Sequence, residues 1–295
     1  MEAKLAISGG SKAVKAEEVL CRRSSMNYKY ENRKDFVFKI CRLGLWYLNC
    51  HTCGEESFHE ILDRQLPIYR LTTLWDGKNH PANSDFPRTN SQWCQLADEL
   101  QMLYKDNKLD SLVFEEKGFD LLYPYIKGRI QTDIEKWPWI PCGYSPHKLP
   151  KENIFDIFAY EDIESADQRV VYFHIANICM PESPFKDMNA RAHGLLNMVK
   201  AIKHRFPSVE KIECDSWLNS FEPFLKLFPA SYPQKNEVQP KVGYGFNWWG
   251  QFLSRDGSFH NRHGKIMRQT GKFPFVSRTG ICDIDNVEKY LLLKL

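Results

Sequence analysis

Residues 169–218 read RVVYFHIANICMPESPFKDMNARAHGLLNMVKAIKHRFPSVEKIECDSWL, and three patterns follow one another in this stretch. Asp187 can cap a helix that Pro207 stops. The apolar residues between them share one helix face: Met188, Ala192, Leu195, Leu196, Val199, Ile202 and Phe206. A β-rich run precedes this helix and a second one follows it, so the stretch predicts a strand, a helix and a strand.

The second run, 211–218, has the alternation of a strand with one buried side. Ile212 and Cys214 would lie on the buried face. The residues between and after them would lie on the other face: Glu213, Asp215 and Trp217. Charged residues that alternate in this way are typical of a face in water.

Further elements are predicted on both sides of this unit. Upstream, residues 154–160 (IFDIFAY) form another β-rich run, and a charged turn separates it from 169–178, which predicts a hairpin. Downstream we expect a short helix over 221–228, a hairpin turn at Asp256-Gly257, a helix ending at Gly271, a strand over 273–281 and a terminal helix.

The first half of the chain carries helical patterns instead. Apolar residues recur at helical spacing in the first of them: Phe36, Ile40, Leu43 and Tyr47. Ser57 and Glu60 form a capping box for a second helix, and a third is expected from Ser91. Neither a helix nor a central strand tolerates the four prolines within 137–150, so we place a domain boundary there.

These patterns predict an α/β (α+β) protein. We expect an arm over 1–30, a mostly helical domain over 31–150, and a domain over 151–295 with a mixed sheet and flanking helices.

The composition of the 295 residues is that of a folded globular protein, with 43% hydrophobic, 14% aromatic and 26% charged residues. The 40 basic and 37 acidic residues are interspersed, which argues against nucleic-acid binding. No apolar stretch reaches the roughly 20 residues that span a bilayer, and the first residues lack an apolar signal core, so neither membrane insertion nor secretion is expected. We therefore expect a cytoplasmic protein whose nine cysteines are reduced thiols.

Compact catalytic motifs are missing from the sequence. It contains no GxxxxGK[ST] phosphate loop, no HExxH zinc motif, no GxSxG nucleophile turn and no Hx[DE] pair for non-haem iron. Several common enzyme classes are therefore not the first hypotheses.

Over roughly residues 150–235, the order of elements resembles that of the GNAT-like acyltransferase superfamily. The CDSWL segment at 214–218, after a helix ending in Phe-Pro, looks like the divergent C-terminal GNAT-like domains of some biosynthetic acyltransferases. In that superfamily the strand before the long helix offers backbone groups to pantetheine, and the helix N-terminus receives the pyrophosphate of the acyl carrier. Residues 191–196 (RAHGLL) partly match the family's [QR]-x-x-G-x-[GA] turn, with Leu196 in place of Gly or Ala. Asn219 matches an asparagine at the end of the family's next strand.

The resemblance implies a set of donor-binding residues: Ile175, Asn177, Arg191, His193, Gly194 and Asn219. The implied reaction moves an acyl group from acyl-CoA, or from an acyl-carrier-protein thioester, to an amine or hydroxyl of a small molecule in a biosynthetic pathway, and no metal is expected. On this hypothesis the preferred general base is His174, because a histidine titrates near neutrality, and Glu213 and Asp215 are alternatives.

Each of these residues also has a purely structural interpretation. His174 could be a hydrogen-bonded histidine within a sheet, and Glu213 and Asp215 the water-facing side of a strand. Arg191 and His193 could be residues of the helix surface.

A zinc-stabilised protein is one alternative hypothesis. Cys50 and Cys53 form half of a zinc site, which His260 and His263 could complete across the fold. The competing interpretation is a loop with reduced thiols.

A non-catalytic module that binds glycan or protein is the other alternative. Its aromatic surface would use some of the eight tryptophans, including Trp137, Trp139, Trp248 and Trp249. Core packing is the commoner use of tryptophan, because its side chain buries a large area.

Overall fold

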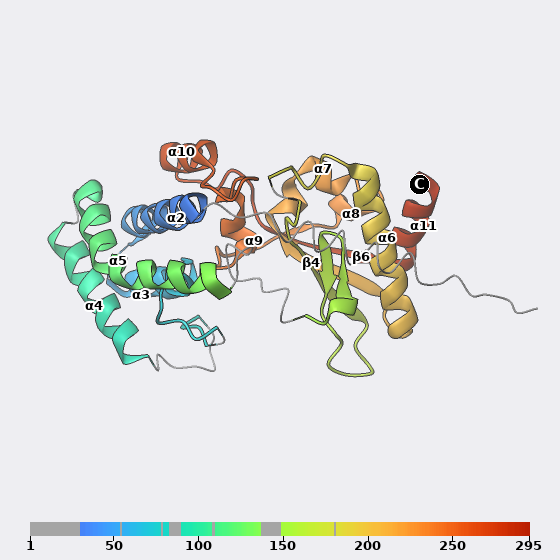
Figure 1. The fold of residues 1–295 in the computed structure, drawn as a ribbon, viewed down its shortest axis with the longest axis horizontal. Coiled ribbons are helices and arrows are strands. Elements are labelled where there is room, and N and C mark those ends of the chain that lie inside the picture. Colours follow the sequence, from blue (N-terminus) through green and yellow to red (C-terminus); the bar gives the residue numbers. More distant parts are fainter. Residues whose placement is uncertain are drawn as a thin grey trace, which may run out of the picture.

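The computed structural model describes residues 30–53, 55–77, 79–82, 90–107, 110–136, 149–179 and 181–295. A body of helices and a body built on a sheet lie next to each other along the longest axis of the molecule (Figure 1). The expected N-terminal arm up to residue 29, and residues 137–148 of the proline-rich stretch, lie outside the described residues.

Among the described residues, the helical body is built on four long helices: α2 Tyr30–His51, α3 Glu55–Arg64, α4 Ser91–Asp106 and α5 Ser111–Lys136. The predicted start of α4 at Ser91 is confirmed, and Asn90 caps it by accepting a hydrogen bond from the N–H of Trp93 at 3.0 Å. α3 begins two residues before the expected Ser57, whose hydroxyl accepts a hydrogen bond from the N–H of Cys53 at 2.8 Å. No described helix is long and apolar enough to cross a membrane.

The predicted apolar face of α2 is buried. Phe36, Ile40, Leu43 and Tyr47 are each at most 5% exposed, and they share one hydrophobic cluster with residues of α3, α4 and α5. The spacing of these residues places them on one side of the helix, so burying that side ties α2 to its neighbours.

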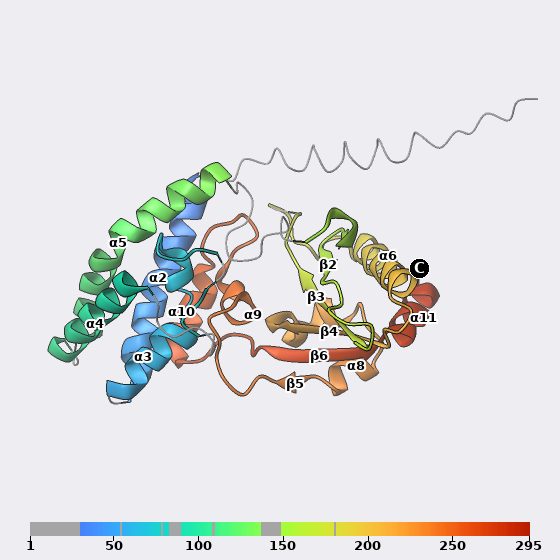
Figure 2. The same ribbon diagram turned by 90° about the horizontal axis from the view of Figure 1, so that it is seen from below.

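The described strands form one six-stranded mixed sheet in the order β1-β2-β3-β4-β6-β5 (Figure 2). The strands are β1 Ile154–Phe155, β2 Phe158–Tyr160, β3 Val170–Ile175, β4 Lys211–Ser216, β5 Glu237–Val238 and β6 Arg278–Asp283. β3 and β4 are parallel, and every other neighbouring pair is antiparallel. The expected α+β class with a mixed sheet is therefore confirmed.

The predicted hairpin between 154–160 and 169–178 is formed by β2 and β3, with Phe158 opposite Ile175. The run 154–160 is itself broken into two short strands. Asp156, between them, has a φ of 55°, so the chain turns there in a left-handed conformation.

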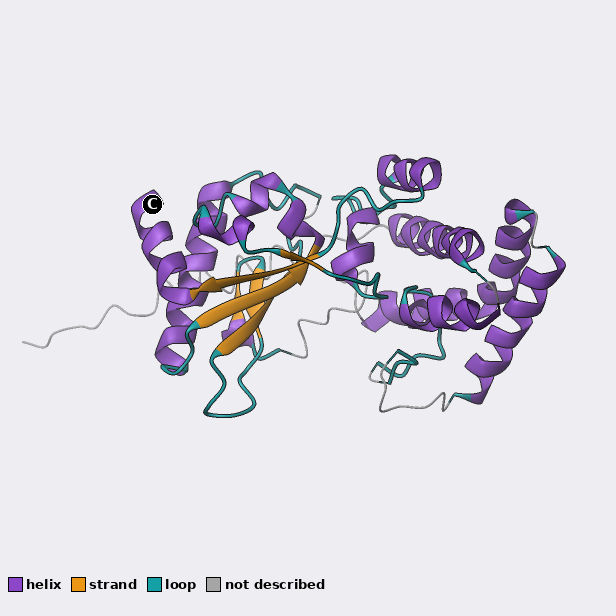
Figure 3. Cartoon of the chain, turned by 180° about the vertical axis from the view of Figure 1, so that it is seen from behind, coloured by secondary structure: helices purple, strands orange, loops and turns teal. Residues whose placement is uncertain are grey.

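The long helix predicted after Asp187 is α6, Met188–Arg205. The Asp187 carboxylate caps it by accepting a hydrogen bond from the N–H of Ala190 at 2.9 Å. α6 and the terminal helix α11, Ile284–Lys294, cover the same face of the sheet. Figure 3 shows the long strands in front of the helices that cover their other face.

Short helices complete the described fold: α7 Glu222–Leu225, α8 Ser231–Gln234, α9 Phe246–Trp249, α10 Asn261–Thr270, and the single turns Tyr69–Leu71, Lys151–Asn153, Trp217–Ser220 and Gly250–Phe252. As predicted, α10 is closed by Gly271, whose φ is 69°. The strand expected over 273–281 begins only at Arg278. Phe273 packs instead on Trp249, and the N–H of Phe275 donates to Gln251, so neither residue joins the sheet.

Two separate hydrophobic clusters do not follow the boundary expected at residue 150. One lies between the sheet and its helices. The other joins α2 to α5 with residues far along the chain: Trp248, Trp249, Phe252, Phe259 and Met267. The indole N–H of Trp249 donates to the carbonyl of Gln65 at 2.7 Å. The chain therefore leaves the sheet after β5, packs with the helical body, and returns to the sheet as β6.

Candidate functional site

The face of the sheet opposite α6 and α11, which we call the open face, carries polar side chains. Side chains alternate between the two faces along β3 and β4. Those toward α6 are buried: Val171, Phe173, Ile212 and Cys214. Those of the open face are partly or fully exposed: Tyr172, His174, Glu213 and Asp215. The three catalytic candidates from the sequence therefore share one face, together with a tyrosine that the sequence analysis did not select.

Tyr172 and Glu213 are partners in the parallel register, and the pKa of each side chain responds to the other. Burial, with a smaller effect from the charge of Asp215, raises the pKa of Glu213. The charge of Glu213, with burial second, raises the pKa of Tyr172. The raised pKa of the phenol keeps its proton in place beside the Glu213 carboxylate.

Asp215 extends this polar surface toward β6. The hydroxyl of Thr279 donates to Oδ1 of Asp215 at 2.5 Å, and the two residues are cross-strand partners. On the other side of β6, Thr279 pairs with the exposed Glu237 of β5. Carboxylates therefore lie on two strands of the open face, β4 and β5, with the hydroxyl of Thr279 on β6 between them.

His174 lies at the other side of Tyr172, close to the end of β3. Its Nε2 is 2.6 Å from Oε1 of Glu161, the residue that follows β2. The hydrogen bond from His174 is the main reason why the pKa of Glu161 is lowered. An ionised carboxylate can only accept, so we assign the Nε2 proton to His174 and a lone pair to its Nδ1 in the neutral form.

The parallel pairing of β3 and β4 stops before either strand ends. Its described register consists of three pairs: Val170–Lys211, Val171–Ile212 and Tyr172–Glu213. β3 nevertheless continues to Ile175 and β4 to Ser216. Beyond Tyr172 and Glu213, the backbone N–H and C=O groups that each strand directs toward the other are therefore not part of the parallel ladder.

Two of the residues implied for donor binding lie at this end of β3. Ile175 pairs with Phe158 on the β2 side, so its main chain is held from one edge. Asn177 follows the strand, and its Oδ1 accepts a hydrogen bond from the N–H of Cys179 at 3.1 Å. This hydrogen bond turns the chain at the start of the connection from β3 to α6.

Arg191 and Gly194 lie on the side of α6 that faces the sheet. Arg191 is 4% exposed, with Nε 2.7 Å from Oδ2 of Asp156, and its Nη1 donates to Sγ of Cys179 at 2.7 Å. A Cβ at Gly194 would lie 2.7 Å from Cβ of the same Asp156. The two residues thus hold α6 against the turn between β1 and β2, whereas the resemblance implied a pyrophosphate contact for them.

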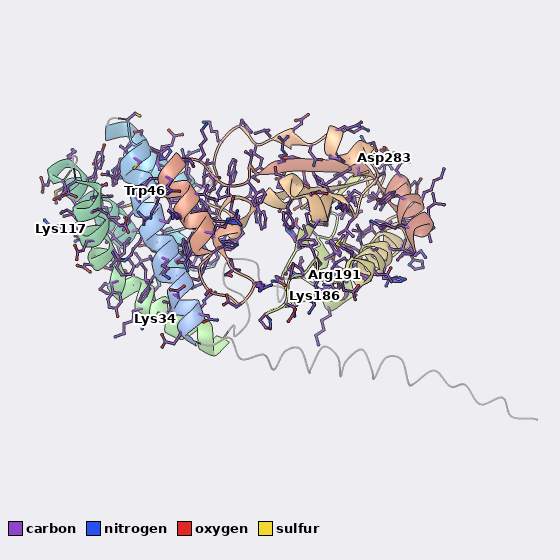
Figure 4. The ribbon with its side chains drawn as sticks, turned by 90° about the horizontal axis from the view of Figure 1, so that it is seen from above. Lys34, Trp46, Lys117, Lys186, Arg191 and Asp283 are labelled. Carbon is purple, nitrogen blue, oxygen red and sulfur yellow. The ribbon has the colours of Figure 1, made fainter. Side chains whose placement is uncertain are left out.

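His193 is exposed on α6, whereas His174 belongs to β3 and has its side chain on the open face. Before α6, the ammonium of Lys186 pairs with Glu182 at 2.7 Å and is 70% exposed. Figure 4 shows Lys186 and Arg191 near the same end of α6. The exposed charged side chains just before α6 are therefore the Lys186–Glu182 pair and the capping Asp187.

Asn219 is buried at 2% exposure and joins two strands. Its Nδ2 donates to the carbonyls of Cys214 and Arg278 at 2.7 and 2.8 Å, and its Oδ1 accepts from the hydroxyl of Tyr232 at 2.7 Å. All these partners belong to the protein's own core. The side chain is therefore engaged in holding β4 beside β6.

The candidate zinc ligands are not gathered into a cluster. Within the part of the chain that the structure describes, no group of three or more His, Cys, Asp or Glu side chains could hold a metal ion. Cys50 and Cys53 are exposed free thiols. His260 and His263 stack on each other with ring centres 3.7 Å apart, and His263 Nδ1 donates to the carbonyl of Gln251 at 2.6 Å. The histidines are thus part of the α10 cap.

The described tryptophans do not form an exposed platform. Trp93, Trp248 and Trp249 are at most 5% exposed, and none of the described tryptophans is in the exposed class. Trp137 and Trp139 lie outside the described residues.

The open face therefore brings His174, Glu213 and Asp215 together, while Arg191, Gly194 and Asn219 are used in packing. Tyr172, Glu161 and Thr279 were missed by the sequence analysis. The alternation of 170–175 places Tyr172 beside His174 and is a signal that could have found it.

No family model, curated protein or solved structure matches this chain.

Proposed function

We propose that this protein is an acyltransferase of the cytoplasm, which transfers an acyl group from a thioester of coenzyme A or of a carrier protein to the amine of a small molecule. The observation that carries the proposal is the His174–Glu161 pair, held on the open face beside the point where β3 and β4 cease to pair. A base and unpaired backbone groups are what a direct acyl transfer requires in one place.

The arrangement of strands supports this proposal. Two parallel strands are joined by the long helix α6, and antiparallel strands border them on both sides. This is the order of elements in which the chain resembles the GNAT-like acyltransferases. The backbone groups beyond Tyr172 and Glu213 would then accept and donate hydrogen bonds along the donor's pantetheine chain.

His174 would remove a proton from the acceptor. The carboxylate of Glu161 orients the imidazole through Nε2 and stabilises the imidazolium that forms. The amine nitrogen then attacks the thioester carbonyl, the carbon–sulfur bond breaks, and the sulfur leaves as a thiolate. Backbone N–H groups outside the ladder would stabilise the oxyanion of the intermediate.

The charge of the open face favours an amine over a carboxylate-bearing acceptor. Glu213 and Asp215 of β4 and Glu237 of β5 lie on this face, with β6 between the two strands. An ammonium group would be attracted to them, and its charge would offset the repulsion from Asp215 that, after burial, raises the pKa of Glu213. His174 is then in position to receive the proton that the ammonium must lose.

The test is an assay with acetyl-CoA and a panel of diamines and amino alcohols, in which acylated product and released coenzyme A are measured by mass spectrometry. We expect acylated amine from the wild-type protein and none above background from His174→Ala. His204→Ala is the matched control, because His204 is an exposed histidine of α6. Equal turnover by both variants would remove His174 from the mechanism.

A further inference from the structure

A cavity of about 390 Å³ lies between α2 and α10, away from the open face of the sheet. Two of its lining residues, Lys39 and Arg42, belong to α2. The others come from α10 and the residues before it: Phe259, Asn261, Gly264, Lys265, Arg268 and Gln269. Figure 4 shows Trp46 of α2 beside α10, at the edge where the two helices meet. We call this cavity the α2–α10 groove.

The groove has basic walls. Lys39 and Arg42 face it from α2, and Lys265 and Arg268 face it from α10, while no acidic residue lines it. Lys39 pairs with Asp35 at 2.6 Å and Arg268 with Glu115 at 2.8 Å. Within the described residues, no acidic partner is found for Arg42 or Lys265. Two positive charges therefore remain uncompensated on opposite walls.

The two arginines are held in place before any ligand arrives. The guanidinium of Arg42 lies 4.2 Å from the ring centre of Phe119. Both terminal nitrogens of Arg268 donate to the carboxylate of Glu115, at 2.8 and 2.9 Å. Binding an anion here would therefore order few additional side-chain rotamers, which lowers the entropic cost of association.

The base of the groove is apolar. Phe259 is 7% exposed, and Gly264 leaves room for its ring, because a Cβ at that position would lie 2.5 Å from Cε1 of Phe259. The lining residues of α10 run from Asn261 to Gln269, a length of about 12 Å along the helix. The groove thus combines dispersed positive charge with an apolar base over two helical turns.

We propose that the α2–α10 groove is the docking site for an acidic segment of a partner protein. Asn261 brings the N-terminus of α10, where backbone N–H groups can bind a phosphate, to one end of the groove, whereas the four cationic side chains are spread over α2 and along α10 as far as Arg268. Carboxylates spread along a segment match charges that are spread along two helices. The groove is separate from the open face, so this inference does not depend on acyl transfer.

The chain's own undescribed segments do not fit this chemistry. Residues 1–29 contain six basic and three acidic residues, and 137–148 contain Lys148 with no acidic residue. Residues 83–89 contain one of each sign, Asp85 and Arg88. Charge complementarity therefore favours another molecule as the occupant.

The probe is a labelled helical peptide with Glu recurring at i, i+4 on one face, and a matched peptide carries Gln at those positions. Fluorescence anisotropy with the full-length protein measures binding. We expect the Glu peptide to bind and the Gln peptide to bind roughly tenfold more weakly, because exposed ion pairs are lost. The affinity should fall as the ionic strength rises from about 0.01 M to about 1 M, since the Debye length shrinks from about 30 Å to about 3 Å.

The decisive variant is Arg42→Gln combined with Lys265→Gln, which should weaken binding of the Glu peptide roughly tenfold. Its control is Lys127→Gln combined with Lys289→Gln, which removes the same charge from exposed positions outside the groove and should leave affinity unchanged. Circular dichroism checks that both fold. If the first variant does not fold, the exposed Lys265→Glu replaces it and should weaken binding as well.

Three results would overturn the proposal. One is equal loss of affinity in both double variants, and another is no binding of the Glu peptide by the wild-type protein at low ionic strength. The third is binding of inorganic pyrophosphate alone, without the peptide and dependent on Arg42 and Lys265, which would assign the groove to small anions.

Discussion

The imidazole Nε2 of His174 lies 2.6 Å from Oε1 of Glu161, although the two are 13 positions apart in the chain. Antiparallel pairing of β2 with β3 brings them together. The N–H of Glu161 donates to the carbonyl of Tyr172 at 2.9 Å, which extends the hairpin to this residue. The register of this hairpin therefore places the side chains of His174 and Glu161 in contact.

Glu161→Gln should lower the rate of acyl transfer less than His174→Ala does. Loss of a general base costs about 100-fold or more, whereas Gln still accepts a hydrogen bond from Nε2 and loses only the charge that stabilises the imidazolium. We expect an intermediate decrease in kcat with little change in KM. Steady-state kinetics of both variants and of His204→Ala measure this, and a Glu161→Gln enzyme with wild-type kcat would exclude Glu161 as a positioning residue.

Glu213→Gln should stabilise the protein at neutral pH. Because the pKa of Glu213 is raised in the folded state, the folded protein binds its proton more tightly than the unfolded chain does. The stability linked to that proton is present at low pH and is lost as the pH rises above the ordinary value of about 4.3. We expect a gain of about 0.5 kcal/mol near pH 7, small because the side chain is partly in water. Urea denaturation at neutral and acidic pH measures it, and a gain of equal size at both pH values would contradict this explanation.

Gly280→Ala should destabilise the sheet body. A Cβ there would overlap the hydroxyl of Tyr232 and lie 2.5 Å from its Cζ, and 2.9 Å from Oδ1 of Asn219. Overpacking of this kind costs about 1–3 kcal/mol. Gly243→Ala is the matched control, because its nearest neighbour would be 3.7 Å away, at Cδ1 of Trp248. Midpoints of urea denaturation compare the two, and equal midpoints would contradict the close approach of Tyr232.

Acidification should destabilise the helical body through His80. This side chain is 3% exposed and stacks on Tyr244 at 3.6 Å, and burial, aided by the charge of Arg70, lowers its pKa to about 3. The unfolded chain gains a proton near pH 6.5, so stability falls as the pH drops from there toward 3, by about 3 kcal/mol at pH 4. His80→Phe should weaken this pH dependence, and the exposed His204→Phe should not. Thermal denaturation over this pH range measures it, and identical slopes for both variants would refute the role of His80.

Elements with a local signal were predictable from the sequence. α6 begins where Asp187 can cap it and ends before Pro207, and its buried face follows from the spacing of its apolar residues. The alternation of 211–218 likewise placed Glu213 and Asp215 on the exposed side of β4. In each case residues within a few positions of one another determine the conformation.

Partners that are distant in the chain were not predictable. Arg191 matched a phosphate-binding pattern, yet its guanidinium is paired with Asp156, which is 35 residues upstream. Neither the left-handed turn at Asp156 nor its approach to Gly194 leaves a trace in the spacing of the helix.

Local patterns along this chain thus determined its α+β class, the extent of α6 and the exposed face of β4. Tertiary structure alone decided that His174 contacts Glu161, that Trp249 packs with the helical body, and that α10 forms a basic groove with α2. The physical reason is that capping and the spacing of apolar residues involve only a few neighbouring residues. Strand register and packing depend instead on which apolar surfaces, distant in the chain, are buried against each other.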